Sequence, residues 1–239
     1  MKSKFRIQFI LVFLIFSIGF LSGCAGGVSA SPTKTPLPTP TSTPVVEMTE
    51  GIKNTEEIVT ARNFILDKQR SVISYSVDET FLNQNNRLAT AVGKTSAISG
   101  EIQIDTQNLS NVTFGEFIVD ISTLKSDSSR RDAAIQNRWL ESEKFPLARF
   151  MVKDVKGLPQ NPKENELVNF QLVGDLTIRE VTRSVTWDVS AMLRGKELTG
   201  KATTFIYMAD WGIEPPNIAG VLIVKDGVSL TLEFVFTEQ

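Results

Sequence analysis

The residue types that most often carry chemistry are scarce in this chain of 239 residues, which has one Cys and no His. Without His there is no imidazole to bind a metal or to act as a general base. A single Cys excludes an intrachain disulfide, a Cys-x-x-Cys redox pair and a thiolate metal cluster. Asp and Glu together number 27, but no spacing among them singles out a catalytic pair. We therefore predict no catalytic residues, no metal site and no cofactor.

The one Cys, Cys24, follows a segment typical of a secretory signal. Three basic residues within the first six positions precede an almost wholly apolar stretch, residues 7–20, which is short for a transmembrane helix. Leu21-Ser22-Gly23-Cys24 then resembles a bacterial lipobox, in which the Cys is acylated and becomes the mature N-terminus. We predict a signal peptide over residues 1–23 and a lipidated Cys24 that anchors the protein on the extracytoplasmic side of a cell-envelope membrane. An uncleaved anchor helix with an incidental Cys is the alternative.

A Pro- and Thr-rich segment follows the predicted anchor. Residues 31–44 read SPTKTPLPTPTSTP and hold five of the ten prolines in the chain. Such a composition cannot bury a core and favours extended polyproline II. At about 3.1 Å per residue the segment would span roughly 40 Å. We predict that residues 24–60 tether a folded domain, residues 61–239, to the membrane; a Pro-rich ligand for a partner domain is the alternative.

Residues 61–239 show a strict alternation of apolar and polar side chains, which is typical of antiparallel strands with one buried face. Turn residues such as Asp226-Gly227 separate the alternating rows, of which we count roughly eight. So many strands predict a closed barrel or a sandwich. The clearest rows are Val168, Phe170, Leu172, Leu176 and Ile178; Trp187, Val189, Ala191 and Leu193; Phe205, Tyr207, Ala209 and Trp211; and Val228, Leu230, Leu232, Phe234 and Phe236.

One segment, residues 126–143, breaks the strand pattern. Its apolar residues have helical spacing, and Asp127 or Ser128 is suited to cap its start. Phe145-Pro146 should end it, because the residue before Pro disfavours helix. We predict a short helix across one end of the barrel, with Trp139 packed on the rim; a gating role for Trp139 is a less favoured interpretation.

Large aromatic side chains occur in the rows that should face inward. In a hollow barrel they would line a ligand site, whereas in a filled barrel they would form an ordinary core, and the pattern alone does not decide. The two tyrosines are the most informative, because a buried phenol needs a hydrogen-bond partner that a ligand could supply. The candidate ligand-binding residues are Tyr75, Phe117, Phe170, Trp187, Phe205, Tyr207 and Phe234.

Several segments resemble the YceI-like family of lipid- or polyisoprenoid-binding proteins. They occur in the family's order from about Phe64 to Phe236, and the most specific is Gly174-Asp175-Leu176-Thr177-Ile178 followed by Val181-Thr182-Arg183-Ser184-Val185-Thr186. The others cover residues 64–67, 71–77, 99–102, 130–132, 143–146, 150 and 210–213.

This resemblance implies an all-β, lipocalin-like antiparallel barrel of about eight strands whose apolar interior holds an isoprenoid or another amphiphilic lipid. The family often has His where this chain has Arg70, Ala134 and Arg179, so any role of those His side chains is lost or changed here. Arg70 and Arg179 are either solvated surface residues, the favoured reading, or contacts for an acidic head group.

Three hypotheses of function follow. The first is a membrane-anchored carrier or reservoir for an isoprenoid-like or fatty lipid, with a hollow barrel. The second is a non-catalytic envelope module with a filled barrel and an exposed apolar patch. The third is a hydrolase of envelope lipid, with two close carboxylates in a cavity. Nucleic acid is not an expected partner, because the net charge is −2 and no basic patch is evident.

Overall fold

A computed structural model describes residues 61–105, 107 and 112–239. The predicted signal peptide and tether lie outside the described residues, and so does Cys24. Cleavage and lipidation therefore stay predictions. Within the described part of the chain, no helix is both long and apolar enough to span a bilayer.

The described chain folds into one antiparallel sheet of 14 strands, four of which have only two residues. The prediction of an all-β antiparallel fold is confirmed, although the expected count of about eight is low. The strands are β1 (Ala61–Leu66), β2 (Val72–Phe81), β3 (Arg87–Thr95), β4 (Ile98–Ser99), β5 (Glu101–Asp105), β6 (Thr113–Phe114), β7 (Phe117–Asp120), β8 (Lys125–Ser126), β9 (Leu147–Lys156), β10 (Val168–Ile178), β11 (Val181–Arg194), β12 (Glu197–Tyr207), β13 (Asn217–Ile218) and β14 (Leu222–Glu238).

The sheet curls into a barrel because β4 and β5 connect its two sides. These strands follow each other across Gly100; β4 pairs with β7, and β5 pairs with β1. The backbone N–H of Leu66 in β1 also donates to the carbonyl of Gly100, over 3.0 Å. Between these junctions run the long neighbours β9, β10, β11, β12 and β14. Alternation along them puts one set of side chains inside the barrel and the other on its surface.

The predicted helix is present but shorter than expected. It consists of α1 (Ser129–Ala134), which continues as a single π-helical turn, η4 (Ile135–Trp139). Ser128 caps it by accepting a hydrogen bond from the backbone N–H of Arg131, as the sequence suggested. The helix ends before Phe145-Pro146 because Glu141 adopts a left-handed φ of 47°.

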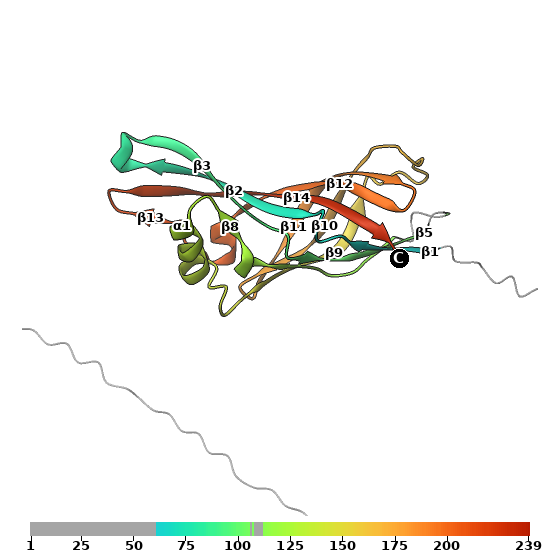
Figure 1. Cartoon of the computed structure of the whole chain (residues 1–239), viewed down its shortest axis with the longest axis horizontal. Helices are drawn as coiled ribbons and strands as arrows, with labels where there is room; N and C mark the ends of the chain where they lie inside the picture. Colours follow the sequence, from blue (N-terminus) through green and yellow to red (C-terminus); the bar gives the residue numbers. More distant parts are fainter. Residues whose placement is uncertain (1–60, 106, 108–111) are drawn as a thin grey trace, which may run out of the picture. The chain divides into compact units, whose positions relative to one another are not determined.

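At the end of the barrel that carries α1, two hairpins extend beyond the last residue of β12, Tyr207. They are β2–β3, closed by the 3₁₀ turn η1 (Leu82–Gln84), and β13–β14. Phe81 of β2 faces Leu222 of β14, so the hairpins form one continuous projection. We call residues 80–90 and 215–224 the flap. Figure 1 shows the flap to the left of α1, whereas β1 and the C-terminus lie at the opposite end of the barrel.

Candidate functional site in the barrel interior

The barrel is hollow, with an interior cavity of about 700 Å³. This volume is within the range of small-molecule sites in proteins. The lining runs from the flap and α1 at one end to the loop of residues 158–166 at the other. On β10 alone it includes Val168, Phe170, Leu172, Leu176 and Ile178, a run of roughly 33 Å at 3.3 Å per residue. A long channel with apolar walls suits an extended hydrocarbon chain.

Several aromatic rings of the channel wall lie against glycines. Tyr75 lies over Gly93, its partner in β3, and Phe234 lies over Gly200, its partner in β12. Phe117 covers Gly100, and Phe150 covers Gly174, in the same way. At each of these glycines a Cβ would come closer than 3.0 Å to the ring. A larger residue would therefore push the ring toward the lumen and narrow it.

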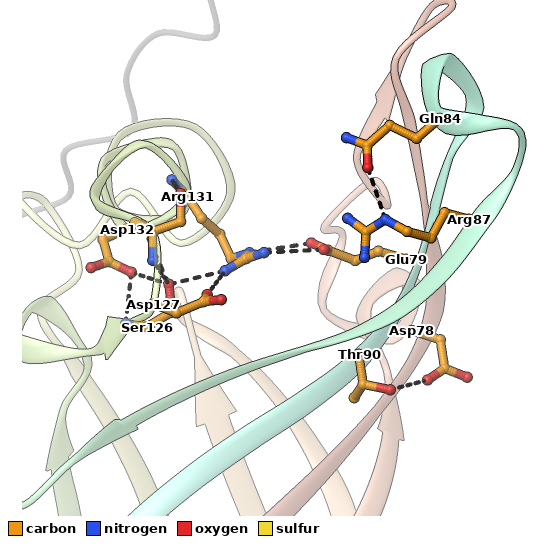
Figure 2. Close-up of polar contacts among 10 residues, drawn as sticks. Asp78, Glu79, Gln84, Arg87, Thr90, Ser126, Asp127, Arg131 and Asp132 are labelled. Atoms are coloured by element: carbon orange, nitrogen blue, oxygen red, sulfur yellow. Dashed lines mark hydrogen bonds and ion pairs between the residues drawn. The ribbon is translucent and has the colours of Figure 1, made fainter.

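The end of the cavity beside α1 carries a buried ion pair. Glu79 of β2 is only 4% exposed and accepts two hydrogen bonds from Arg131 of α1, from Nε over 3.2 Å and from Nη2 over 3.1 Å. Arg131 also donates to Asp127 and to Ser126 Oγ. Figure 2 shows Arg131 reaching from the helix to the strand that carries Glu79.

Arg131 therefore pairs with two carboxylates, Glu79 and Asp127. Burial disfavours the guanidinium charge, but the hydrogen bonds to Glu79 and Asp127 outweigh burial and raise the pKa of Arg131. The neighbouring Asp132 is also buried, and it accepts from Ser126 N over 2.9 Å and from Ser126 Oγ over 2.6 Å. The cluster thus joins α1 to β2 and β8, and its cation is already engaged within the protein.

Two buried polar atoms in the wall lack a hydrogen-bond partner within the described residues: Tyr75 Oη and Trp187 Nε1. Burial raises the pKa of Tyr75 to about 12, because the phenolate would lose its hydration. Tyr75 and Trp187 lie at nearly the same level of the barrel wall, with β14 and β12 between their strands. Leu230 of β14 pairs with Tyr75 on one side and with Thr204 of β12 on the other. The adjacent residue of β12, Thr203, pairs with Asp188, which follows Trp187 in β11. Two donors in an otherwise apolar wall are available to a polar group of a ligand.

Comparison with known proteins identifies this arrangement. The model of the YceI-like domain matches residues 64–236. The chain belongs to the YceI-like family. No curated protein matches the sequence.

Two solved structures share the YceI-like fold of this chain. BcnA of Burkholderia cenocepacia is 17% identical, with a TM-score of 0.56, over 71% of this chain and 98% of its own. A polyisoprenoid binding domain from Saccharophagus degradans, implicated in plant cell wall breakdown, is 13% identical, with a TM-score of 0.54, over 74% of this chain and 98% of its own. At such low identity the likeness shows the fold alone.

Five of the seven aromatic residues that we predicted for the interior of the YceI-like barrel do line the cavity: Tyr75, Phe117, Phe170, Trp187 and Phe234. The prediction is wrong for Phe205 and Tyr207, which are 58% and 52% exposed. On β12 the inward residues include Ala202 and Ile206, so both faces of this strand carry apolar side chains. The two rings instead pack edge to face on the outer surface, with their centroids 5.3 Å apart.

Two of the three residues at which the resemblance led us to expect a change from His, Arg70 and Arg179, have structural partners here. Arg179 donates to the carbonyl of Trp139 over 2.9 Å and pairs with Glu141, which ties the β10–β11 turn to the helical segment. Arg70 pairs with Asp67 and Glu197. Both arginines are therefore engaged by carboxylates of the protein, and neither is simply solvated. Trp139 itself lines the cavity at the helical end, as a rim residue would.

The sequence analysis missed the Glu79–Arg131 pair. Glu79 has the same parity as Ile73, Tyr75 and Val77, so it is a single charged residue in an inward row. That irregularity was the available signal, because a charge on a buried face needs a partner. The partner could not be identified from sequence, since Arg131 is 52 residues away.

Proposed function

We propose that this protein binds an isoprenoid or another amphiphilic lipid inside the barrel and acts as a carrier or reservoir for it. The observation that carries the proposal is the apolar cavity of about 700 Å³, which extends along the barrel from the flap to the far loops. The similarity to a polyisoprenoid binding domain supports the same ligand class. A binding role without catalysis is part of the proposal.

The physical driving force for such binding is the transfer of methylene groups from water to the apolar wall. Each buried CH₂ contributes about 0.8 kcal/mol, so ten of them contribute about 8 kcal/mol before the entropic costs of binding. Tyr75 and Trp187 would orient the polar end of the ligand by hydrogen bonding.

The two other hypotheses fit the structure less well. A filled barrel requires the inward aromatic rings to occupy the interior, whereas here they lie over glycines and leave it open. A hydrolase requires two close carboxylates that are free to act on the ligand, whereas Glu79 and Asp127 both pair with Arg131. The exposed rings of Phe205 and Tyr207 fit the apolar patch of the second hypothesis, but the hollow interior does not fit its filled barrel.

Membrane anchoring through a lipidated Cys24 on the extracytoplasmic side is a second part of the proposal. Its support is the sequence alone, the signal-like segment and the single Cys that follows it. We expect metabolic labelling with a palmitate analogue to mark the wild-type chain and not the Cys24→Ser variant. Labelling of both variants would contradict the proposed anchor.

Native mass spectrometry with lipid extraction tests the ligand. The full chain, extracted from membranes in mild detergent, should carry a stoichiometric lipid in addition to any covalent acyl group. Ala202→Leu, which fills part of the cavity, should weaken this binding, whereas Lys201→Leu on the outer face of the same strand should not. A ligand-free mass that stays unchanged after incubation with a polyisoprenol would contradict the proposal.

A further inference from the structure

The flap is almost free of charge. Residues 80–90 and 215–224 contain one charged side chain, Arg87, whereas 22% of the whole chain is charged. Arg87 is held close to the flap: its Nε donates to Gln84 over 2.8 Å, and its guanidinium lies 4.5 Å from the centre of the Phe81 ring. A projection from a water-soluble surface would be expected to carry more charge than this.

Both faces of the flap carry apolar side chains. Phe81, Leu222 and Ile218 form one cross-strand row, and all three belong to the lining of the cavity. Leu88 and Ile223 both pair with Thr80, so they share the opposite face, where they are 76% and 42% exposed. An ordinary sheet with one solvated face has polar residues at one of the two parities. In the flap this parity is mixed, because Leu88 and Ile223 share it with Thr80 and Asn217, and the turn at residues 83–86 is polar but uncharged.

The apolar wall of the cavity continues directly into the flap. Phe81, Ile218 and Leu222 belong both to the cavity lining and to the projection. An apolar ligand that enters or leaves at this end therefore passes along the flap. This continuity indicates which surface the flap meets, because a lipid ligand comes from a lipid phase.

We propose that the flap docks into the interfacial layer of a lipid bilayer and opens the cavity toward the acyl chains. The inference rests on the proposed lipid-binding function. A bilayer covers both faces of a thin projection at once, whereas a protein partner would need a matching groove with a polar rim. Insertion stops in the interfacial layer, because the edge strands β3 and β13 carry backbone groups that need water or head groups. Arg87 is placed to meet lipid phosphates.

The single native Cys allows a site-specific test on the full chain. In a Cys24→Ser background, Leu88→Cys and Ile223→Cys are each labelled with the environment-sensitive dye NBD. Leu167→Cys is the matched control: Leu167 is 58% exposed and lies at the opposite end of the barrel, just before β10. Vesicles of phosphatidylethanolamine and phosphatidylglycerol are then added.

We expect the NBD emission to shift to the blue and to rise severalfold at positions 88 and 223, and to stay unchanged at 167. The apolar segment before Cys24 can tether all three proteins to the vesicle, so only the contrast between positions decides. An equal response at the three positions would overturn the proposal. So would a shift that appears without vesicles as the protein concentration rises, since it would assign the flap to a second copy of the chain.

A transfer experiment separates this inference from the proposed function. Leu88→Glu and Ile223→Glu should slow the movement of a fluorescent isoprenol from vesicles to the protein about tenfold, because a charge resists entry into the bilayer. Their affinity for the same isoprenol in detergent should equal that of the wild type, since both side chains lie outside the cavity. Absence of binding in detergent to the wild type would overturn the proposed function. Normal binding with unchanged transfer rates would overturn the docking of the flap.

Discussion

Two neighbouring acidic residues of β2 lie on opposite faces of the barrel wall. Glu79 faces inward, is almost fully buried and holds Arg131 through two hydrogen bonds. Asp78 faces outward and pairs with Lys225 over 3.0 Å in an exposed position. Both carboxylates pair with a cationic side chain, but only the Glu79 carboxylate is buried. The comparison teaches that strand parity decides what a side chain contributes, more than its chemical type does.

The aromatic residues repeat this comparison. Phe234 covers Gly200 on the inner face, and Phe205 covers Gly227 on the outer face. The local device is the same, a ring over a glycine of the adjacent strand. On the inner face it shapes the cavity, whereas on the outer face it leaves an exposed ring. Substitutions at matched inner and outer positions should therefore differ in their effect on stability.

Removal of an inner ring should have the largest effect. Phe234→Ala should lower the free energy of unfolding by about 3 kcal/mol, because it removes a buried ring that packs edge to face on Phe236. Phe205→Ala should cost less than about 1 kcal/mol, since that ring is mostly exposed. Denaturant titration of the full chain measures both values. Similar losses for the two variants would contradict the assignment of the faces.

Loss of the inner carboxylate should come next. Glu79→Gln should cost about 2–3 kcal/mol, because Arg131 loses a buried counter-charge. Asp78→Asn should leave the unfolding midpoint unchanged within error. The double variant Glu79→Gln/Arg131→Met should be more stable than Glu79→Gln alone, since it also removes the guanidinium that has lost its buried carboxylate and keeps only the exposed Asp127. A double variant that is less stable would show that the cost has another origin.

The glycines beneath the rings should show a smaller contrast. Gly200→Ala should cost about 2 kcal/mol, because the new Cβ would meet the backbone of Ser190 and Ala191 as well as Phe234. Gly227→Ala would meet only the exposed ring of Phe205, which can turn away. We expect a lower melting temperature for Gly200→Ala than for Gly227→Ala. A lower melting temperature for Gly227→Ala would mean that the inner ring of Phe234 is not packed against Gly200 as described.

The smallest expected effect is the pH dependence caused by Tyr75. In a Tyr207→Phe background Tyr75 is the one remaining tyrosine, and its ultraviolet absorbance should titrate near pH 12 in the folded protein and near pH 10 after unfolding. Because the folded state binds its proton more tightly, the stability from this group is complete below about pH 10 and declines between pH 10 and 12. At pH 11 the loss is about 1 kcal/mol. An unshifted titration would place the phenol in water.

The inner face of a strand could be predicted where every second residue is clearly polar. β10 alternates Phe170 and Leu172 with Asn169 and Gln171, so its inner face was evident. β12 has Ile206 between Phe205 and Tyr207, and with apolar residues at both parities the assignment failed. The start of α1 was predicted from its cap at Ser128, whereas the end of the helical segment, after η4, depends on the left-handed backbone at Glu141, which no preferred residue type marks.

The hollow interior was expected from the family resemblance, but the strand patterns alone could not predict it, for a different reason. It depends on which ring lies across which glycine, and that is decided by register between strands distant in sequence. Gly200 of β12 and Phe234 of β14 are direct cross-strand partners, although 34 positions separate them in the chain. A pattern within one strand carries no information about such pairs, so without the resemblance the same aromatic rows favoured a filled core.

The entry point of the chain into the barrel has a consequence for how a tethered domain would work. β1 begins at Ala61 beside the C-terminal residues, at the end of the barrel away from the flap (Figure 1). Residues 24–60 could reach at most about 130 Å if fully extended. In the proposed lipoprotein, attachment and docking would therefore act at opposite poles of the domain. A tether of this reach would let the domain turn its flap either to the membrane that holds the anchor or to a second surface, so lipid exchange would not be confined to the point of attachment.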